Sequence, residues 1–296
     1  RQAVHYFPRT KFYFWGFNKP GVEEYGLEIE KKWNRVYGRT STHTFSGGFY
    51  VQPNYDSLRA INLGYNPNGR LAVGYLDWSS SIGAVDLSLN AASTLGDYST
   101  WNFHRLTALS SFKSKKIYGV RTFQRLIAGK IWSNDQIQIP GQEGYNIEGN
   151  SSNDLLRKNY LVDQFYGNFD LFNHYHMPGE GNIRGFVNSS QRGADAMVSS
   201  STEFVADKGL FENRLNISFS IFADAGIFWD KAAYHPWYPN RVFDRYLGNV
   251  GFGTRLNTKL FEKELFLRFD VPAYIFNDGN SEINFHNWIF SFQRSI

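Results

Sequence analysis

The chain has 296 residues but no cysteine, and it contains only 2 methionines and 9 prolines. The lack of cysteine excludes a disulfide framework and any zinc or iron–sulfur site with cysteine ligands. No run of about 18 apolar residues occurs, which excludes a bundle of membrane-spanning helices, and the mean hydropathy is −0.43. These absences leave a membrane β-barrel open, because only one face of each barrel strand is apolar.

The basic residues of the chain do not form a continuous block. The 31 lysines and arginines are scattered among 27 aspartates and glutamates, which gives a net charge of +4. A nucleic-acid-binding protein needs its basic residues clustered, so we expect no nucleic acid partner. Residues 1–8 lack the apolar core of a signal peptide, so we expect either a mature N-terminus here or a piece of a longer protein.

Aromatic residues and alternation dominate what is present. Aromatics make up 18% of the chain, with 27 Phe, 18 Tyr and 8 Trp, and glycine is also frequent at 27. In residues 215–227 every second side chain is apolar, and Ser218, Ser220 and Asp224 lie between them. This period of two predicts a strand of about 13 residues, longer than the usual strand of about 5 to 6.

The same alternation recurs along the chain. It is clear in residues 85–91, 250–257, 265–271 and 287–293, and weaker in residues 22–33, 39–51, 57–65, 70–80, 101–112, 117–132 and 194–206. Glycine, asparagine, aspartate and proline indicate hairpin turns at residues 66–69, 95–97 and 278–280. No segment has a convincing helical stripe of apolar residues. We therefore predict an all-β fold of about a dozen or more antiparallel strands.

A soluble β-sandwich is the alternative, since its strands also alternate. The length of the strands and the aromatic residues near their ends argue against it, because aromatics at both ends of an apolar band are typical of membrane interfaces. We predict a transmembrane antiparallel β-barrel of the outer-membrane type, as a single domain over residues 1–296. The tryptophans near predicted strand ends are Trp33, Trp78, Trp101, Trp132, Trp229 and Trp288.

One segment interrupts the alternation. Residues 133–192 are rich in glycine, asparagine, glutamine and proline. They far exceed the about 12 to 15 residues beyond which a loop is usually functional or disordered. We expect a long lumenal or extracellular loop. Within it, residues 177–186 read Met-Pro-Gly-Glu-Gly-Asn-Ile-Arg-Gly-Phe.

This loop and the strands after it resemble the outer-membrane assembly factor superfamily, the bacterial surface antigen family of BamA, TamA and two-partner secretion transporters. In that family a hydrophobic-Arg-Gly-aromatic loop tip folds into the lumen, where its arginine meets the acidic residue of an aromatic-x-Asp-x-Gly strand. Residues 251–255 and 267–272 also look like the family's late strands. The matching residues are Ile183, Arg184, Gly185 and Phe186 at the tip, and Phe222, Asp224 and Gly226 on the strand.

The resemblance implies sixteen strands, five of them after the loop, near residues 194, 215, 249, 264 and 286. The length of chain outside the loop predicts about 13 instead, at roughly 18 residues per strand and turn. We expect none of the family's periplasmic POTRA modules in this chain. The last strand, which would form one side of a seam, lacks a glycine and carries Trp288, Phe290 and Phe292.

The chemistry of the residues gives an independent reason to pair Arg184 with Asp224. Asp224 lies on the polar face of its strand, and a guanidinium can satisfy both oxygens of a carboxylate inside a narrow barrel. Glu203, if it also faces the lumen, offers a second anchor. The alternative is that Arg184 is a solvated loop residue and that Asp224 pairs with Arg255 or Arg268.

Enzyme signatures are missing from the sequence. There is no His-Glu-x-x-His, no Gly-x-Ser-x-Gly and no phosphate-binding loop, so we expect no enzyme activity and no cofactor. His174 and His176 are two imidazoles without a third ligand nearby, so we predict no metal site.

Two functional hypotheses remain for a barrel plugged by the Arg184 loop in a bacterial outer membrane. In the first, the barrel inserts or translocates polypeptide, and a substrate strand pairs with an open seam between the first and last strands. In the second, the barrel anchors or exports an enzyme or binding module. A passive channel fits less well, because the loop would obstruct the pore. The expected partners are outer-membrane lipid or lipopolysaccharide, and a polypeptide substrate or accessory envelope subunits.

Overall fold

The computed structural model describes residues 2–7, 9–19, 22–37, 39–55, 69–133, 143–146, 181–186, 192–210, 215–230, 243–260 and 263–294. The described residues are almost entirely strands, and the all-β prediction is confirmed. No helix among them is long and apolar enough to cross a membrane. The elements are β1 (Gln2–Phe7), β2 (Thr10–Lys19), β3 (Val22–Tyr37), β4 (Arg39–Tyr55), β5 (Gly69–Ile82), β6 (Val85–Thr94), η1 (Gly96–Tyr98), β7 (Phe103–Lys113), β8 (Val120–Ser133), β9 (Tyr145–Asn146), β10 (Arg192–Ala194), β11 (Ala196–Leu210), β12 (Leu215–Asp230), β13 (Phe243–Leu260), β14 (Lys263–Asn277), β15 (Asn280–Ile283) and β16 (Ile289–Arg294).

One antiparallel sheet of 14 strands makes up the wall of the molecule. Its order follows the chain from β1 to β8 and then from β11 to β14. β15 and β16 both pair with β14, β15 along residues 274–277 and β16 along residues 265–270. The sheet is therefore 13 strands across, as the chain length predicts. Within the described residues the sheet has fewer strands than the sixteen that the resemblance implied, because β9 and β10 lie outside it.

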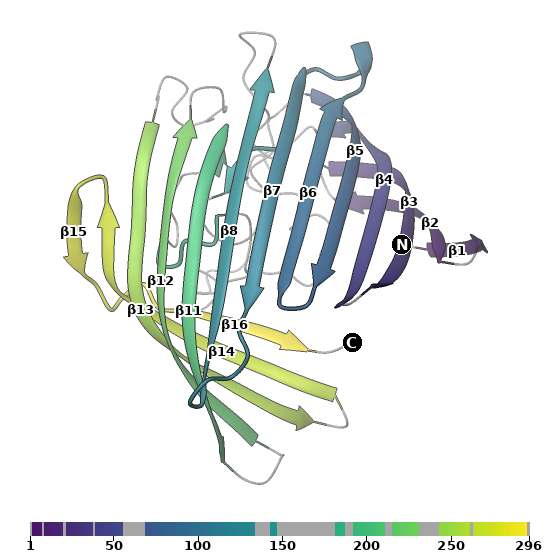
Figure 1. Ribbon diagram of the computed structural model, residues 1–296. Coiled ribbons are helices and arrows are strands. Elements are labelled where there is room, and N and C mark those ends of the chain that lie inside the picture. The colour runs from purple at the N-terminus through teal and green to yellow at the C-terminus, as the bar shows by residue number, and fades with distance from the viewer. Residues whose placement is uncertain are drawn as a thin grey trace.

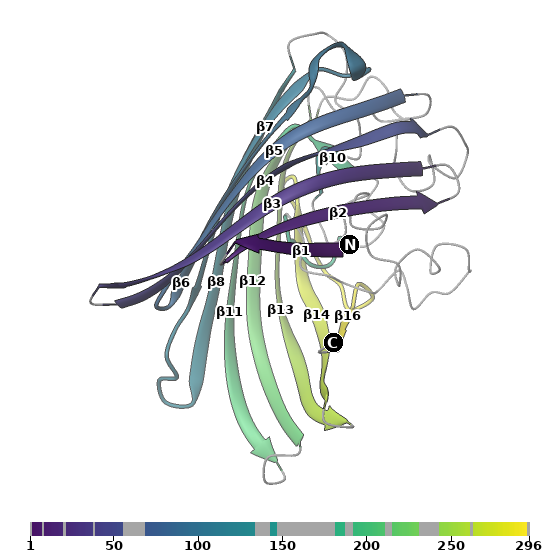
Figure 2. The same ribbon diagram turned by 90° about the vertical axis from the view of Figure 1, so that its right-hand side faces the viewer.

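The sheet curls like the wall of a barrel (Figures 1 and 2), with β1 at one edge and the β15 and β16 segments at the other. The curl follows from the right-handed twist that every strand passes to its neighbour. Among the residues that the structure describes, no backbone pairing joins β1 to β16. β9 and β10 form a separate pair.

The outer face of the sheet is apolar. On β12, Phe219 and Ile221 are 57% and 63% exposed, whereas Ser218, Ser220 and Asp224 between them are buried. The predicted alternation is thus confirmed with its predicted register. We call the exposed side chains that continue this face around the sheet the outer apolar belt: Phe14, Ile29, Phe45, Phe49, Leu76, Leu89, Leu106, Leu126, Val198, Phe204, Phe219, Ile221, Val250, Phe252 and Phe269.

The inner face carries a hydrophobic core as well as polar residues, which the alternation did not predict. This core contains three residues from the long loop, Tyr145, Ile183 and Phe186. The strands contribute inward-facing apolar side chains against which the loop packs. The main ones are Leu71, Val73, Phe103, Ile127, Ile131, Met197, Phe228, Leu247 and Ile275.

Two strands precede the first one predicted. In β2, Phe12, Tyr13, Phe14 and Trp15 are consecutive aromatics, so no period of two is visible. Their faces nevertheless differ, because the Trp15 indole nitrogen donates to Glu24 Oε1 over 3.0 Å while Phe14 is exposed. The predicted strand 57–65 lies outside the described residues. The five predicted strands after the loop are present as β11 to β14 and β16, with β15 as an additional short strand.

The two ends of the sheet have connections of different length. At one end the turns are short: residues 8–9, 38, 83–84, 114–119, 211–214 and 261–262. The long connections, residues 56–68, 95–102 and the loop after β8, join strands at the other end. We call these the short-turn end and the loop end.

Candidate functional site at the tip of the loop

The loop tip, residues 181–186, lies against the inner face of β11 to β14. Ile183 and Phe186 are buried, and Ser199 Oγ donates to the Gly181 carbonyl over 2.6 Å. A Cβ at Gly226 would lie 3.2 Å from Ile183 Cδ1. The absence of a side chain at Gly226 therefore lets the tip approach β12 closely.

Arg184 forms a two-pronged contact with Asp224. Its Nε donates to Asp224 Oδ2 and its Nη2 to Oδ1, both over 2.7 Å. Its backbone N–H also reaches Oδ2, at 3.2 Å. Arg184 is only 1% exposed and Asp224 2%, so this is a buried, bidentate, charge-assisted pair.

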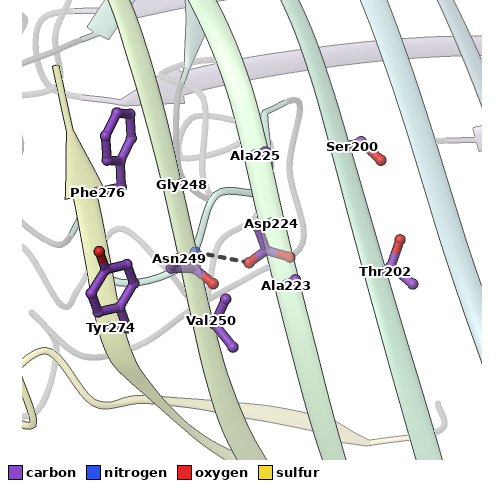
Figure 3. A pocket seen from close by; sticks show the side chains of 10 residues that line it. All are labelled: Ser200, Thr202, Ala223, Asp224, Ala225, Gly248, Asn249, Val250, Tyr274 and Phe276. Carbon is purple, nitrogen blue, oxygen red and sulfur yellow. Dashed lines mark hydrogen bonds between the residues drawn. The ribbon is translucent and has the colours of Figure 1, made fainter. Parts of the chain in front are cut away.

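Two neighbours complete the coordination of the Asp224 carboxylate. Ser201 Oγ donates to Oδ1 over 2.6 Å, and Asn249 Nδ2 donates to Oδ2 over 3.1 Å (Figure 3). The same Asn249 amide lies 2.7 Å from the carbonyl oxygen of Arg184. Asn249 therefore binds both the carboxylate on β12 and the backbone of the loop tip.

The far side of the guanidinium meets β14 and an aromatic ring. Arg184 Nη1 donates to Asp270 Oδ2 over 3.1 Å, and its Cζ lies 3.5 Å from the centre of the Phe222 ring. Burial alone would lower the pKa of Arg184, but the negative charges of Asp224, Asp270 and Glu203 outweigh it and raise this pKa. The arginine is thus held permanently charged between acidic residues on three strands.

Glu203 is a second centre of the same network, but its main partners are not in the loop. Arg255 Nη2 lies 2.5 Å from Glu203 Oε2, and Arg268 Nη2 lies 3.1 Å from both carboxylate oxygens. Arg184 Nη1 is farther away, at 3.9 Å. Arg255 and Arg268 therefore neutralise Glu203, and Asp224 does not pair with either of them.

The tip also contacts the last strands. Gly185 has φ of +87°, and a Cβ there would lie 2.7 Å from Pro272 Cγ, so both the backbone and the space favour glycine. Asn287 Nδ2 donates to the Gly185 carbonyl over 2.7 Å. Trp288 packs against Phe269 with ring centroids 5.4 Å apart.

The predicted seam residues at the end of the chain lie beside β14. Phe290 pairs with Phe269 and Phe292 with Leu267 in the backbone register.

An earlier part of the loop makes a second contact with the wall. Glu143 is fully buried and accepts hydrogen bonds from Tyr50 Oη over 2.5 Å and from Arg105 Nη1 over 3.0 Å. The Tyr145 hydroxyl lies 2.8 Å from Thr107 Oγ1. The described parts of the loop are therefore held at two places about 40 residues apart. One is held by β4 and β7, and the other by β11 to β14.

The outer face of the wall behind Asp224 is hollowed. The hollow lies between Tyr274 and Phe276 on one side and Ser200 and Thr202 on the other (Figure 3). Its floor is formed by Ala223, Ala225, Gly248 and Val250. The volume is ≈ 380 Å³. Small side chains on the outer face thus coincide with the strands whose inner face holds the loop tip.

Sequence reasoning missed several members of the site. Asp270 was missed, although its spacing from Arg268 puts both on one face of β14, which was the available signal. Ser201 and Asn249 carried none, because a serine or asparagine on a polar strand face is common. Glu143 lay in an unpatterned loop. His174 and His176 lie outside the described residues.

Comparison with known proteins gives one kind of match. No protein-family model and no curated protein matches the chain. Among solved structures it is similar to BamA from Haemophilus ducreyi, in a crystal structure lacking POTRA domains 1–3, with a TM-score of 0.53 and 13% sequence identity. The match covers 97% of this chain and 61% of that chain. At this identity the likeness shows the fold alone: the chain has a BamA-like barrel fold.

Proposed function

We propose that this chain is the membrane barrel of a bacterial outer-membrane protein of the assembly and translocation class, and that it inserts or moves polypeptide. The observation that carries the proposal is the buried fork between Arg184 and Asp224. It holds the loop tip inside a curled sheet whose two edges are not paired with each other in the described part of the chain. The same motif at the tip and on its partner strand underlies the resemblance to the assembly factor superfamily.

The two faces of the sheet support a membrane location. The outer apolar belt presents large side chains to the surroundings over most strands, which is costly in water and favourable in lipid. Outer-membrane barrels have short turns on the periplasmic side and longer loops outside. The short-turn end is therefore proposed to face the periplasm, and outer-membrane lipid or lipopolysaccharide to surround the belt.

The free edges support a role for strand pairing. Edge strands carry unpaired N–H and C=O groups that can bind an added strand. With the loop fixed inside the lumen, the space between β1 and β16 is the route by which a substrate strand would reach the wall. The substrate is then an unfolded polypeptide able to form strands, and accessory envelope subunits would deliver it.

A locked seam tests this function. The chain lacks cysteine, so cysteines at Val4 on β1 and Phe290 on β16 can be joined by a bismaleimide. The barrel would be reconstituted in liposomes and supplied with a urea-unfolded outer-membrane barrel. We expect the unlocked protein to accelerate insertion and the locked protein to lose this effect, whereas each single-cysteine protein treated with the reagent keeps it.

The second hypothesis, an anchor or export barrel for another module, makes a different forecast. In that case neither the locked nor the unlocked barrel accelerates insertion. Full activity of the locked barrel would contradict the seam mechanism directly.

A further inference from the structure

The turn between β7 and β8 differs from the other turns at its end of the barrel. β8 leads into the long loop, so residues 114–119 lie at the short-turn end. They form a connection of six residues, whereas the other turns at that end have one to four. The turn is well built: Ile117 and Val120 exchange two backbone hydrogen bonds of 2.9 Å, and Thr122 N donates to Ser114 Oγ over 2.8 Å.

The tip of this turn exposes two large apolar side chains. Tyr118 is 102% exposed and Ile117 63%, so the tyrosine ring gains no burial within the described chain. Tyr118 has φ of +49° and Gly119 +84°, as a type I′ hairpin turn requires at its two central positions. Asparagine followed by glycine is the preferred sequence there, and a bulky residue with positive φ is strained. Tyrosine therefore occupies a position where the conformation of the turn favours asparagine.

The surroundings of the tip are strongly basic. Residues 98–134 contain no aspartate or glutamate but seven lysines and arginines. Lys113, Lys115 and Lys116 are exposed beside the tip, and Arg121 follows it on β8. Across the sheet, Asp86 pairs with Ser111, and Asp207 follows Ala206, which pairs with Val120. We call the basic residues around Ile117 and Tyr118 the cationic collar: Lys113, Lys115, Lys116 and Arg121.

We infer that residues 113–121 form a docking knob for an acidic protein surface with an apolar hollow at its centre. Exposed tyrosines are frequent anchors of protein interfaces, and like-signed charges around an anchor steer an oppositely charged partner and select it. The inference rests on the proposed function only for the side of the membrane on which the knob lies. It names a partner surface, which the seam mechanism does not.

A protein partner fits the position better than a lipid surface. On β7 the last apolar residue on the outer face is Phe112, beyond Leu106 of the outer apolar belt, and the outward positions that follow, Ser114 and Lys116, are polar. On β8 the outward positions Thr122 and Gln124 are polar until Leu126. The knob has therefore left the belt before its tip is reached.

Photocrosslinking in cells tests the docking. Benzoylphenylalanine would replace Ile117 in the full chain, with the same residue at Ala84, in the two-residue turn at the same end, as the matched control. We expect a discrete adduct to one protein from position 117 and at most a tenth of that yield from position 84. The crosslinked peptide should lie next to aspartates or glutamates.

Two variants identify the chemistry of the contact. Tyr118→Asn keeps the turn, because asparagine accepts positive φ, but removes the ring. Lys115→Glu with Lys116→Glu reverses the collar. Each should lower the adduct yield at least tenfold while heat-modified migration of the folded barrel is unchanged. An adduct that survives both, or equal yields at positions 117 and 84, would overturn the inference.

A fluorescence measurement separates lipid from protein. Tyr118→Cys, the single cysteine of that variant, would carry an environment-sensitive bimane in vesicles of phosphatidylcholine with or without phosphatidylglycerol. An unchanged spectrum supports the protein partner, whereas a blue shift with phosphatidylglycerol would assign the knob to the membrane and overturn it. Thiol protection of Phe219→Cys in the same vesicles tests the barrel itself, so loss of docking and loss of the proposed function are told apart.

Discussion

The side-chain amide of Asn287 donates a hydrogen bond to the carbonyl oxygen of Gly185 over 2.7 Å. This contact joins the connection between β15 and β16 to the tip of a loop that begins after β8. It lies where β14 lacks a continuous partner, between β15 and β16. The loop tip therefore braces the interrupted edge of the sheet as well as the interior.

Removal of this bond should loosen the loop tip and the edge together. We expect Asn287→Ala to lower stability by about 0.5 to 1.5 kcal/mol, the net contribution of one neutral hydrogen bond. Hydrogen exchange should increase in residues 183–186 and 289–294. Asn284→Ala is the control, because Asn284 contacts Glu282 and His286 in the same segment but not the tip. Equal exchange at the tip in both variants would contradict the brace.

The fork of Arg184 and Asp224 should behave as one unit. Arg184→Ala and Asp224→Asn each leave a buried charge without its partner, which costs about 3 to 5 kcal/mol. The strand ladder does not depend on this contact, so we expect the barrel to survive and the loop to become protease-sensitive near residues 181–186. The double variant should add little to either single one. Fully additive effects would mean that the two residues act separately.

Substitution of Glu203 should destabilise the barrel more than substitution of an acid whose partner is exposed. Glu203→Gln leaves Arg255 and Arg268 close together without the carboxylate that separates them, and a loss of about 3 to 5 kcal/mol is expected for a buried charge. Asp195→Asn breaks a pair with Lys130, whose side chain is 41% exposed, and should cost about 0 to 1 kcal/mol. The temperature at which the barrel unfolds in detergent gives the comparison; similar losses would contradict it.

Adjacent residues should label differently if the outer apolar belt lies in lipid. In reconstituted barrels, Leu89→Cys and Phe219→Cys should react with a lipid-soluble maleimide and resist a charged methanethiosulfonate. Ser88→Cys, one residue away on the inner face of β6, should show the reverse preference. Charged-reagent labelling of Leu89→Cys and Phe219→Cys at the rate of Ser88→Cys would refute the membrane orientation.

Much of the wall was predictable because a strand repeats every two residues. Alternation in residues 215–227 alone separates Phe219 and Ile221 from Ser218 and Asp224, and the structure keeps those faces. The strands β1 and β2 were not predictable in this way. Four consecutive aromatics in β2 mask which side of the strand faces inward.

The sequence by itself determined the class of fold, the strand faces and the local chemistry of the tip. A carboxylate on the polar face of a barrel strand favours a guanidinium partner. Only the tertiary structure decided how the acids are shared, with Asp270 beside Asp224 on Arg184, and Glu203 on Arg255 and Arg268. Such sharing depends on the register of strands far apart in the chain and on where the loop enters. Local periodicity holds no information about either.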